Sequence, residues 1–211
     1  MTTSVRTLLA INVGALLSLA AAIGATLAAG LPLSALFRDP LEVAGSHALV
    51  GLASNVGVLL WCATASICFC TAESVRRRGG NRGTRGLFTY FAVLTSVLLA
   101  DDLLMIHDRL MRDTVGVGGW VLFPLYGLAV VFGAYRYADV LARTDYRPAV
   151  LALAFFAMSM GVDAVQSPLQ NVLGQWRIAV EDGFKFLGIV AWTTYWVGTC
   201  LGELGRERGP A

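Results

Sequence analysis

The chain has 211 residues, of which 56% are hydrophobic and 14% are charged, and its formal net charge is +2. Soluble domains carry about 25% charged residues, so this composition argues against a soluble protein. The apolar residues stand in long blocks rather than periodic stripes, which is typical of membrane-spanning helices. We therefore expect an all-α, polytopic membrane helix bundle, in which residues 1–211 form a single integral membrane domain.

Six apolar blocks are long enough to cross a hydrocarbon core of about 30 Å. They cover residues 7–29, 47–72, 87–106, 120–141, 149–165 and 180–201. The first block is longer than the apolar region of a signal peptide, which has about 7–15 residues. We therefore expect the first block to be retained and the chain to have six transmembrane helices.

The basic residues predict the orientation of these helices. With six helices, one side of the membrane holds Arg6, Arg76, Arg77, Arg78, Arg82, Arg85, Arg136, Arg143, Arg147, Arg206 and Arg208. The opposite side holds Arg38, Arg109, Arg112 and Arg177. The positive-inside rule assigns the arginine-rich side to the cytoplasm, so we expect both termini there. This rule explains the arginines without a nucleic-acid partner.

Ionisable residues lie in the third, fifth and sixth blocks, where lipid disfavours them. The candidate ion-binding or relay residues are Asp101, Asp102, His107, Asp108, Asp163, Glu181, Asp182 and Lys185. A rise of about 1.5 Å per helical residue places Asp101, Asp163 and Glu181 in the same outer third of the bilayer. Intramembrane charge costs about 2.5–3.5 kcal/mol per residue on insertion scales, so it indicates a functional site. We expect Asp101 or Asp102, Asp163, Glu181 and Lys185 to converge; if the cluster is purely structural, Lys185 is expected to neutralise Glu181 or Asp163.

Several functions are compatible with this cluster. Acids inside a helix bundle mark ion routes and proton relays, which favours the binding or translocation of a cation, either a proton or a divalent metal. Carboxylates and a histidine at Asp101, Asp102, His107, Asp163 and Glu181 could hold a divalent metal ion. A metal-dependent hydrolase acting on a lipid is one alternative. A structural role, as in an accessory subunit of a membrane complex, is the other. We favour the cation-binding interpretation over an enzyme, and no catalytic residue is assigned.

Other residue types in the apolar blocks have simpler explanations. The cysteines, which are Cys62, Cys68, Cys70 and Cys200, are expected to be small buried hydrophobic residues rather than disulfide partners. Trp61, Trp192 and Trp196 are expected in the helix core. Small residues spaced by four predict close helix packing at Gly14–Ser18–Ala22 and Ala53–Gly57. Tyr90, Tyr135, Tyr137 and Tyr146 are expected at the cytoplasmic membrane surface.

Residues 98–108, 158–163 and 181–192 resemble a group of bacterial multi-pass membrane proteins of unknown function. In that group an Asp-Asp and a His-acid pair end one helix, and Glu-Asp-Gly-x-Lys-x-x-Gly begins another. The resemblance covers roughly the C-terminal two-thirds of the chain. It implies a six-helix fold in the bacterial inner (plasma) membrane and offers no activity. The expected partners are the lipid bilayer and a cation, with a second copy of the chain or a larger membrane complex as open alternatives.

The ceramidase-like and progestin-receptor-like membrane hydrolases were compared with the same residues. The zinc sites of those hydrolases use several histidines, including a spaced pair late in the chain. This sequence contains two histidines in total, His47 and His107. The histidine content therefore argues against membership of these hydrolase families.

Overall fold

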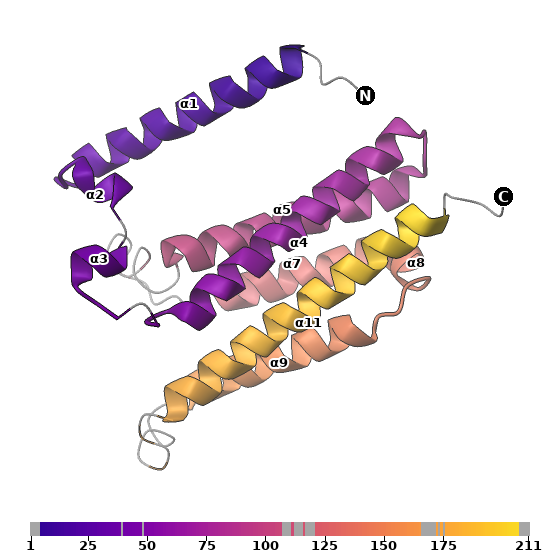
Figure 1. The fold of residues 1–211 in the computed structure, drawn as a ribbon. Coiled ribbons are helices and arrows are strands. Elements are labelled where there is room, and N and C mark those ends of the chain that lie inside the picture. Colours follow the sequence, from indigo (N-terminus) through magenta and orange to yellow (C-terminus); the bar gives the residue numbers. More distant parts are fainter. Residues whose placement is uncertain are drawn as a thin grey trace. The chain divides into compact units, whose positions relative to one another are not determined.

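The computed structural model describes residues 5–38, 40–47, 49–106, 111, 116, 121–165, 172, 174 and 176–206. Within these residues the secondary structure consists of helices, without strands, which confirms the all-α prediction. The contacts divide the chain into two compact units, residues 1–52 and 53–211. Each unit is described below by itself (Figure 1).

The first unit contains the helix α1 (Val5–Ala28) and two short helices, α2 (Ser34–Phe37) and α3 (Pro40–Ala44). The helix α1 occupies the first predicted block, whereas α2 and α3 were not predicted. Gly30 follows α1 with φ +69°, a conformation that glycine adopts without strain. The apolar side chains of Leu16, Leu17 and Leu27 are exposed on α1, as expected of a helix that faces lipid.

The second unit contains the remaining helices. They are α4 (Leu52–Arg77), α5 (Arg82–Leu104), α7 (Leu122–Arg136), α8 (Ala138–Leu141), α9 (Arg147–Ala164) and α11 (Trp176–Arg206). Each of the other five predicted blocks therefore contains a helix, and the fourth block is divided at Tyr137 into α7 and α8. The helices α9 and α11 pack against each other, and α5 contacts both α7 and α8 (Figure 1).

Three of the described helices, α4, α5 and α9, are long and apolar enough to cross a membrane, judged by length and composition. The described part of α1, Asn12–Ala28, and the helix α7 are shorter apolar helices. The helix α11 is 31 residues long, but its apolar interior is interrupted by Thr193, Thr194 and Tyr195. These helices are compatible with a membrane protein, and the number of six membrane spans remains a prediction.

The core of the second unit is aromatic. Trp61, Trp192 and Trp196 are buried, which confirms their predicted place. The ring of Phe91 lies 4.5 Å from that of Trp196, measured between centroids, and Trp61 stacks on Phe156 at 6.0 Å. Aromatic pairs at such separations each contribute about 0.5–1.5 kcal/mol beyond the burial of their surface. Side-chain packing therefore joins α4, α5, α9 and α11.

Two glycines allow neighbouring helices to approach closely. A Cβ atom on Gly133 would lie 2.5 Å from Cε1 of Tyr90, and one on Gly188 would lie 2.6 Å from Cε1 of Phe156. The contact of Gly57 is looser, because its Cβ would lie 3.1 Å from Cδ1 of Ile189. A Cβ on Gly14 would meet nothing within 4 Å in the described residues. Of the predicted small-residue positions, Gly57 therefore lies at a helix contact within the second unit.

The cysteine prediction is half right. Cys68 and Cys200 are buried next to each other, whereas Cys62 and Cys70 are exposed on α4. All four are free thiols. Exposure of these small apolar residues is compatible with a helix surface that lipid covers.

Candidate functional site

A polar layer forms where the C-terminal ends of α5 and α9 meet the N-terminal part of α11. We use the name polar layer for Trp61, Asp101, Asp102, Tyr126, Asp163, Arg177, Glu181 and Lys185. The acids Asp101 and Asp102 lie in the last turn of α5, and Asp163 lies in the last turn of α9. Glu181 and Lys185 lie one helical turn apart near the start of α11.

Asp102 is the centre of the layer. Its Oδ1 atom lies 2.5 Å from Nζ of Lys185 in α11, and its Oδ2 atom accepts a hydrogen bond of 2.9 Å from Nε1 of Trp61 in α4. The Asp102 side chain is only 9% exposed, whereas that of Lys185 is 38% exposed. One carboxylate therefore joins three helices, and each of its oxygens has a donor.

The end of α5 makes these donors necessary. Met105 follows the helix in the left-handed region, with φ 51°, and its N–H bonds to the carbonyl oxygen of Asp101. A helix C-terminus carries a partial negative charge, so carboxylates are disfavoured there. The ammonium of Lys185 and the indole N–H of Trp61 offset this unfavourable placement of Asp102. The acids thus lie at a helix end where the helix dipole disfavours a carboxylate.

Asp101 is the most buried acid of the layer, with a relative exposure of 5%. The hydroxyl of Tyr126 in α7 interacts with the Asp101 carboxylate, and the charge of Asp102 also acts on this tyrosine. The two consecutive acids therefore face different partners, because adjacent helical residues point about 100° apart. Tyr126 brings α7 to the layer, in addition to α4, α5, α9 and α11.

The second acidic pair lies between α9 and α11. Oε2 of Glu181 lies 2.5 Å from the guanidinium of Arg177, one turn earlier in α11, and both side chains are largely buried. The like charge of Asp163 acts on Glu181 more strongly than that of Asp182 does. Within the described residues Asp163 has no ion-pair partner. Asp182, which follows Glu181, is exposed. The charges of these two half-buried carboxylates thus repel each other, and among the described residues only Glu181 of the two has an ion-pair partner.

The structure corrects the predicted pairing of Lys185. Its partner is Asp102 rather than Glu181 or Asp163, because the side chain reaches across to α5 instead of back along its own helix. Arg177, which the sequence placed at an outer rim in contact with water, is the cation that pairs with Glu181. The sequence analysis did not select Trp61 or Tyr126. His107 and Asp108 lie outside the described residues.

The layer contains no preformed metal site among the residues that the structure describes. No group of three or more His, Cys, Asp or Glu side chains in that part of the chain is arranged to hold a metal ion. The predicted ligand set at Asp101, Asp102, His107, Asp163 and Glu181 includes one residue outside that part. Among the described residues, each carboxylate pair lies beside one fixed cation: Lys185 pairs with Asp102, and Arg177 pairs with Glu181.

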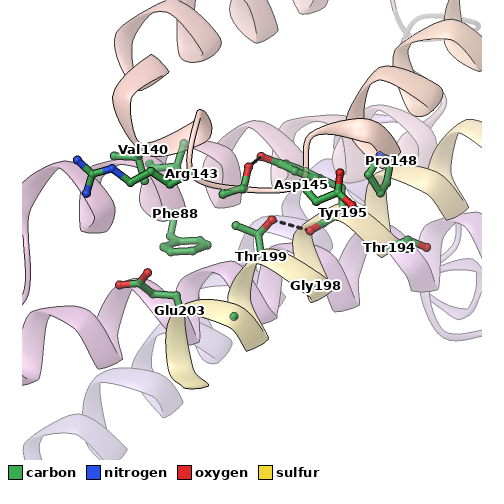
Figure 2. Close-up of a pocket in the computed structure, with 13 residues that line it drawn as sticks. Phe88, Val140, Arg143, Asp145, Pro148, Thr194, Tyr195, Gly198, Thr199 and Glu203 are labelled. Atoms are coloured by element: carbon green, nitrogen blue, oxygen red, sulfur yellow. Dashed lines mark hydrogen bonds between the residues drawn. The ribbon is translucent and has the colours of Figure 1, made fainter. Parts of the chain in front are cut away.

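A separate cavity of about 370 Å³ lies near the other end of α11 (Figure 2). Hydroxyl groups line part of it: the oxygens of Thr144 and Tyr195 lie 3.0 Å apart, and Thr199 donates to the carbonyl oxygen of Tyr195. Two acids, Asp145 and Glu203, line it, and the side chain of Asp145 is 72% exposed and lies 3.9 Å from Arg147. Since Asp145 is well solvated, water can stabilise its charge, whereas the nearly buried Asp102 depends on protein donors. The polar layer is therefore the stronger candidate site.

The fold and the polar layer together define an all-helical protein with membrane-compatible helices and an internal ionic network. Residues 9–199 match the family described as Domain of unknown function (DUF8692), and the chain belongs to this family. No curated protein and no solved structure matches the chain. The family description assigns no activity, so the function must be argued from the geometry of the polar layer.

Proposed function

We propose that this chain is an integral membrane protein that binds and exchanges a cation, a proton or a small metal ion, in the polar layer. The observation that carries the proposal is the repulsion between the like charges of Asp163 in α9 and Glu181 in α11, two helices that pack against each other. Arg177 pairs with Glu181, and within the described residues Asp163 has no ion pair.

The physical reason lies in the energy of confined charge. Two carboxylates that share a partly buried site repel each other, and a cation bound near both of them relieves that repulsion. Uptake of one positive charge relieves the repulsion between Asp163 and Glu181. The same event changes the local potential around Lys185, one turn further along α11. A cation at Asp163 and Glu181 would therefore change the electrostatic potential at the Lys185–Asp102 pair.

Lys185 is suited to such an exchange. An ammonium on a flexible four-carbon chain reorients more readily than a planar guanidinium that is held by two hydrogen bonds. Its 38% exposure leaves room for the side chain to withdraw from Asp102. Trp61 would keep the carboxylate oriented while Lys185 moves. The proposed cycle alternates between Lys185 and an incoming cation as the counter-charge of the acids.

The membrane setting of this proposal rests on the exposed apolar surface and on the arginines. Val97 on α5, Leu128 on α7 and Leu153 on α9 are exposed large hydrophobic side chains, which water would disfavour. With six spans and both termini in the cytoplasm, the polar layer lies in the outer half of the bilayer of a bacterial inner membrane. There the low dielectric strengthens every charge–charge interaction of the layer.

The proposal is tested with purified protein in detergent and in proteoliposomes. Proton flux is measured with an enclosed pH dye, and thermal unfolding is measured with and without divalent cations. A cation at 100 times its Kd stabilises the folded state by about 2.7 kcal/mol, which is readily detected. Asp163→Asn and Glu181→Gln keep the shape of each side chain and remove its charge, so they should abolish the flux or the stabilisation.

Asp145→Asn is the matched control, because it removes one carboxylate from the exposed cavity near the other end of α11. This variant should retain the response of the unmodified protein. If the unmodified protein shows neither flux nor ion-dependent stabilisation, and the Asp163 and Glu181 variants only unfold, the layer is structural. Hydrolysis of a lipid ester or amide that these variants abolish would instead establish an enzyme.

A further inference from the structure

A basic cleft lies between the first turns of α5 and the junction of α7 with α8, away from the polar layer. Its volume is about 550 Å³, and it is lined by Arg82, Arg85, Gly86, Thr89, Tyr90 and Tyr137. It therefore combines two guanidinium groups with hydroxyl groups and aromatic walls. This is the donor set that recognises phosphate oxygens in proteins.

The two arginines of the cleft have no counter-ion in the part of the chain that the structure describes. Arg82 and Arg85 are exposed, and their side chains make no ion pair there. Arg76 and Arg77, in the same arginine-rich region, differ because both bond to Glu73 at 2.6 Å. Arg82 and Arg85 thus have no ion pair within the described residues, whereas Arg76 and Arg77 share the carboxylate of Glu73.

The aromatic wall of the cleft is held in place by its own contacts. The hydroxyl of Tyr90 donates to the carbonyl oxygen of Ala129 at 2.7 Å, and the rings of Tyr90 and Tyr137 lie 5.9 Å apart. Arg136 places its guanidinium carbon 5.2 Å from the centre of the Tyr137 ring, which adds a third cation close to the cleft. Gly86 leaves little spare room, because a Cβ there would lie 3.0 Å from Tyr137.

An exposed apolar surface begins at the same wall. The ring of Phe132 in α7 lies 6.0 Å from that of Tyr90 and is 58% exposed. Leu128 and Leu125, one and two turns earlier in α7, are also exposed. An occupant with a negative head and an apolar tail would therefore satisfy both the arginines and this face of α7. A free phosphate would use only the first of these two surfaces.

We infer that this cleft binds the phosphodiester headgroup of an anionic phospholipid, with an acyl chain along the exposed face of α7. Basic pockets between membrane helices on the cytoplasmic side are known to hold such headgroups. The arginine distribution predicts that side for Arg82 and Arg85. The bound lipid would fix α7 against α5, which are the helices that carry Tyr126 and Asp101 at their other ends.

The test measures lipid binding to the full chain in detergent by native mass spectrometry, using phosphatidylglycerol and phosphatidylcholine. The protein should bind phosphatidylglycerol in preference to phosphatidylcholine. Each basic residue near a membrane surface contributes about 1 kcal/mol to anionic-lipid binding, so the double substitution Arg82→Gln/Arg85→Gln should weaken that binding about tenfold or more. The control Arg76→Gln/Arg77→Gln removes the same charge from residues already paired with Glu73 and should change binding by less than about threefold.

Three results would overturn the inference. One is equal binding of the two lipids by the unmodified protein. Another is an equal loss in the two double variants when both melt normally, which would mean that only net charge matters. The third is competition by inorganic phosphate or glycerol phosphate at concentrations comparable to the lipid, which would identify a soluble phosphate compound as the occupant.

Discussion

Lys185 and Asp102 are 83 residues apart in the sequence, and the ammonium of one lies 2.5 Å from a carboxylate oxygen of the other. The pair joins α11 to α5, and Trp61 ties the same carboxylate to α4. The Asp102 side chain is nearly buried. Removal of either donor therefore leaves one oxygen of the charged Asp102 carboxylate without a hydrogen bond. The stability of this junction is therefore measurable by substitution.

Lys185→Met should destabilise the protein by about 1–3 kcal/mol, since an unsatisfied buried charge remains on Asp102. The double variant Asp102→Asn/Lys185→Met should recover part of this loss, because both charges are gone. Thermal or denaturant unfolding in detergent gives the coupling energy of the cycle, expected at about 0.5–3 kcal/mol. Arg147→Met is the control, because its exposed partner Asp145 should make the change worth less than about 1 kcal/mol. Additive effects of the Asp102 and Lys185 changes would contradict a stabilising pair.

The three core tryptophans predict a graded response to replacement by phenylalanine. The indole N–H of Trp61 bonds a charged oxygen of Asp102, and that of Trp192 bonds the neutral hydroxyl of Thr95 at 3.2 Å. The indole N–H of Trp196 is buried and has no hydrogen-bond partner among the described residues. The loss of ring volume is similar in all three. The lost hydrogen bond should add about 1.5–3 kcal/mol at Trp61, about 0.5–1.5 kcal/mol at Trp192 and nothing at Trp196. Unfolding free energies that do not follow this order would argue against the bond between Trp61 and Asp102.

Gly133→Ala and Gly188→Ala should each destabilise the fold by about 1–3 kcal/mol, because the new methyl group would overlap the ring of Tyr90 or Phe156. Gly127→Ala and Gly198→Ala are matched controls on α7 and α11. A Cβ at either control position meets nothing within 4 Å in the described residues, so alanine should be neutral or stabilise the helix by up to about 1 kcal/mol. Melting temperatures compare the four variants, and similar values for all of them would refute the close helix contacts.

The orientation is tested by labelling single cysteines in a background that lacks Cys62, Cys68, Cys70 and Cys200. A cysteine at Ser46 should react with a membrane-impermeant maleimide added to intact cells, because the arginine distribution places it outside. A cysteine at Arg78 should react only after the membrane is permeabilised. Reaction of the Arg78 position in intact cells would reverse the predicted topology.

The sequence predicted the positions of the helices well because the length of an apolar block is set by the hydrocarbon it must match. It predicted helix ends less well. The helix α11 begins at Trp176 and ends at Arg206, beyond the predicted block at both ends, because polar residues such as Glu203 continue a helix outside the apolar region. The helix α4 begins only at Leu52, after Gly51 with its φ of +71°.

Part of the polar layer could be predicted from the sequence because charges in apolar blocks are rare. Asp102, Asp163, Glu181 and Lys185 stand out for that reason alone. Their pairing could not be predicted, since spacing within one helix says nothing of how that helix is rotated toward another. Lys185 could reach Glu181 on its own helix, yet it reaches Asp102. Trp61 and Tyr126 were missed because the sequence of an apolar block does not indicate whether the N–H of a tryptophan or the O–H of a tyrosine bonds to a charged side chain.

The separation of Lys185 from Asp102 also bears on how the chain is assembled. Helices of a nascent membrane protein emerge in sequence order, so α5 leaves the ribosome with its two acids long before α11 is made. Tyr126 arrives first and can shield Asp101, but Asp102 must wait for the last helix to supply its counter-charge. Until then, Asp102 lacks the counter-charge of Lys185, so in a bilayer the retention of α5 beside the insertion machinery is the less costly state. Completion of the last helix is thus the step at which this chain can commit to its folded form, and truncation before Lys185 should yield a product that quality-control proteases remove.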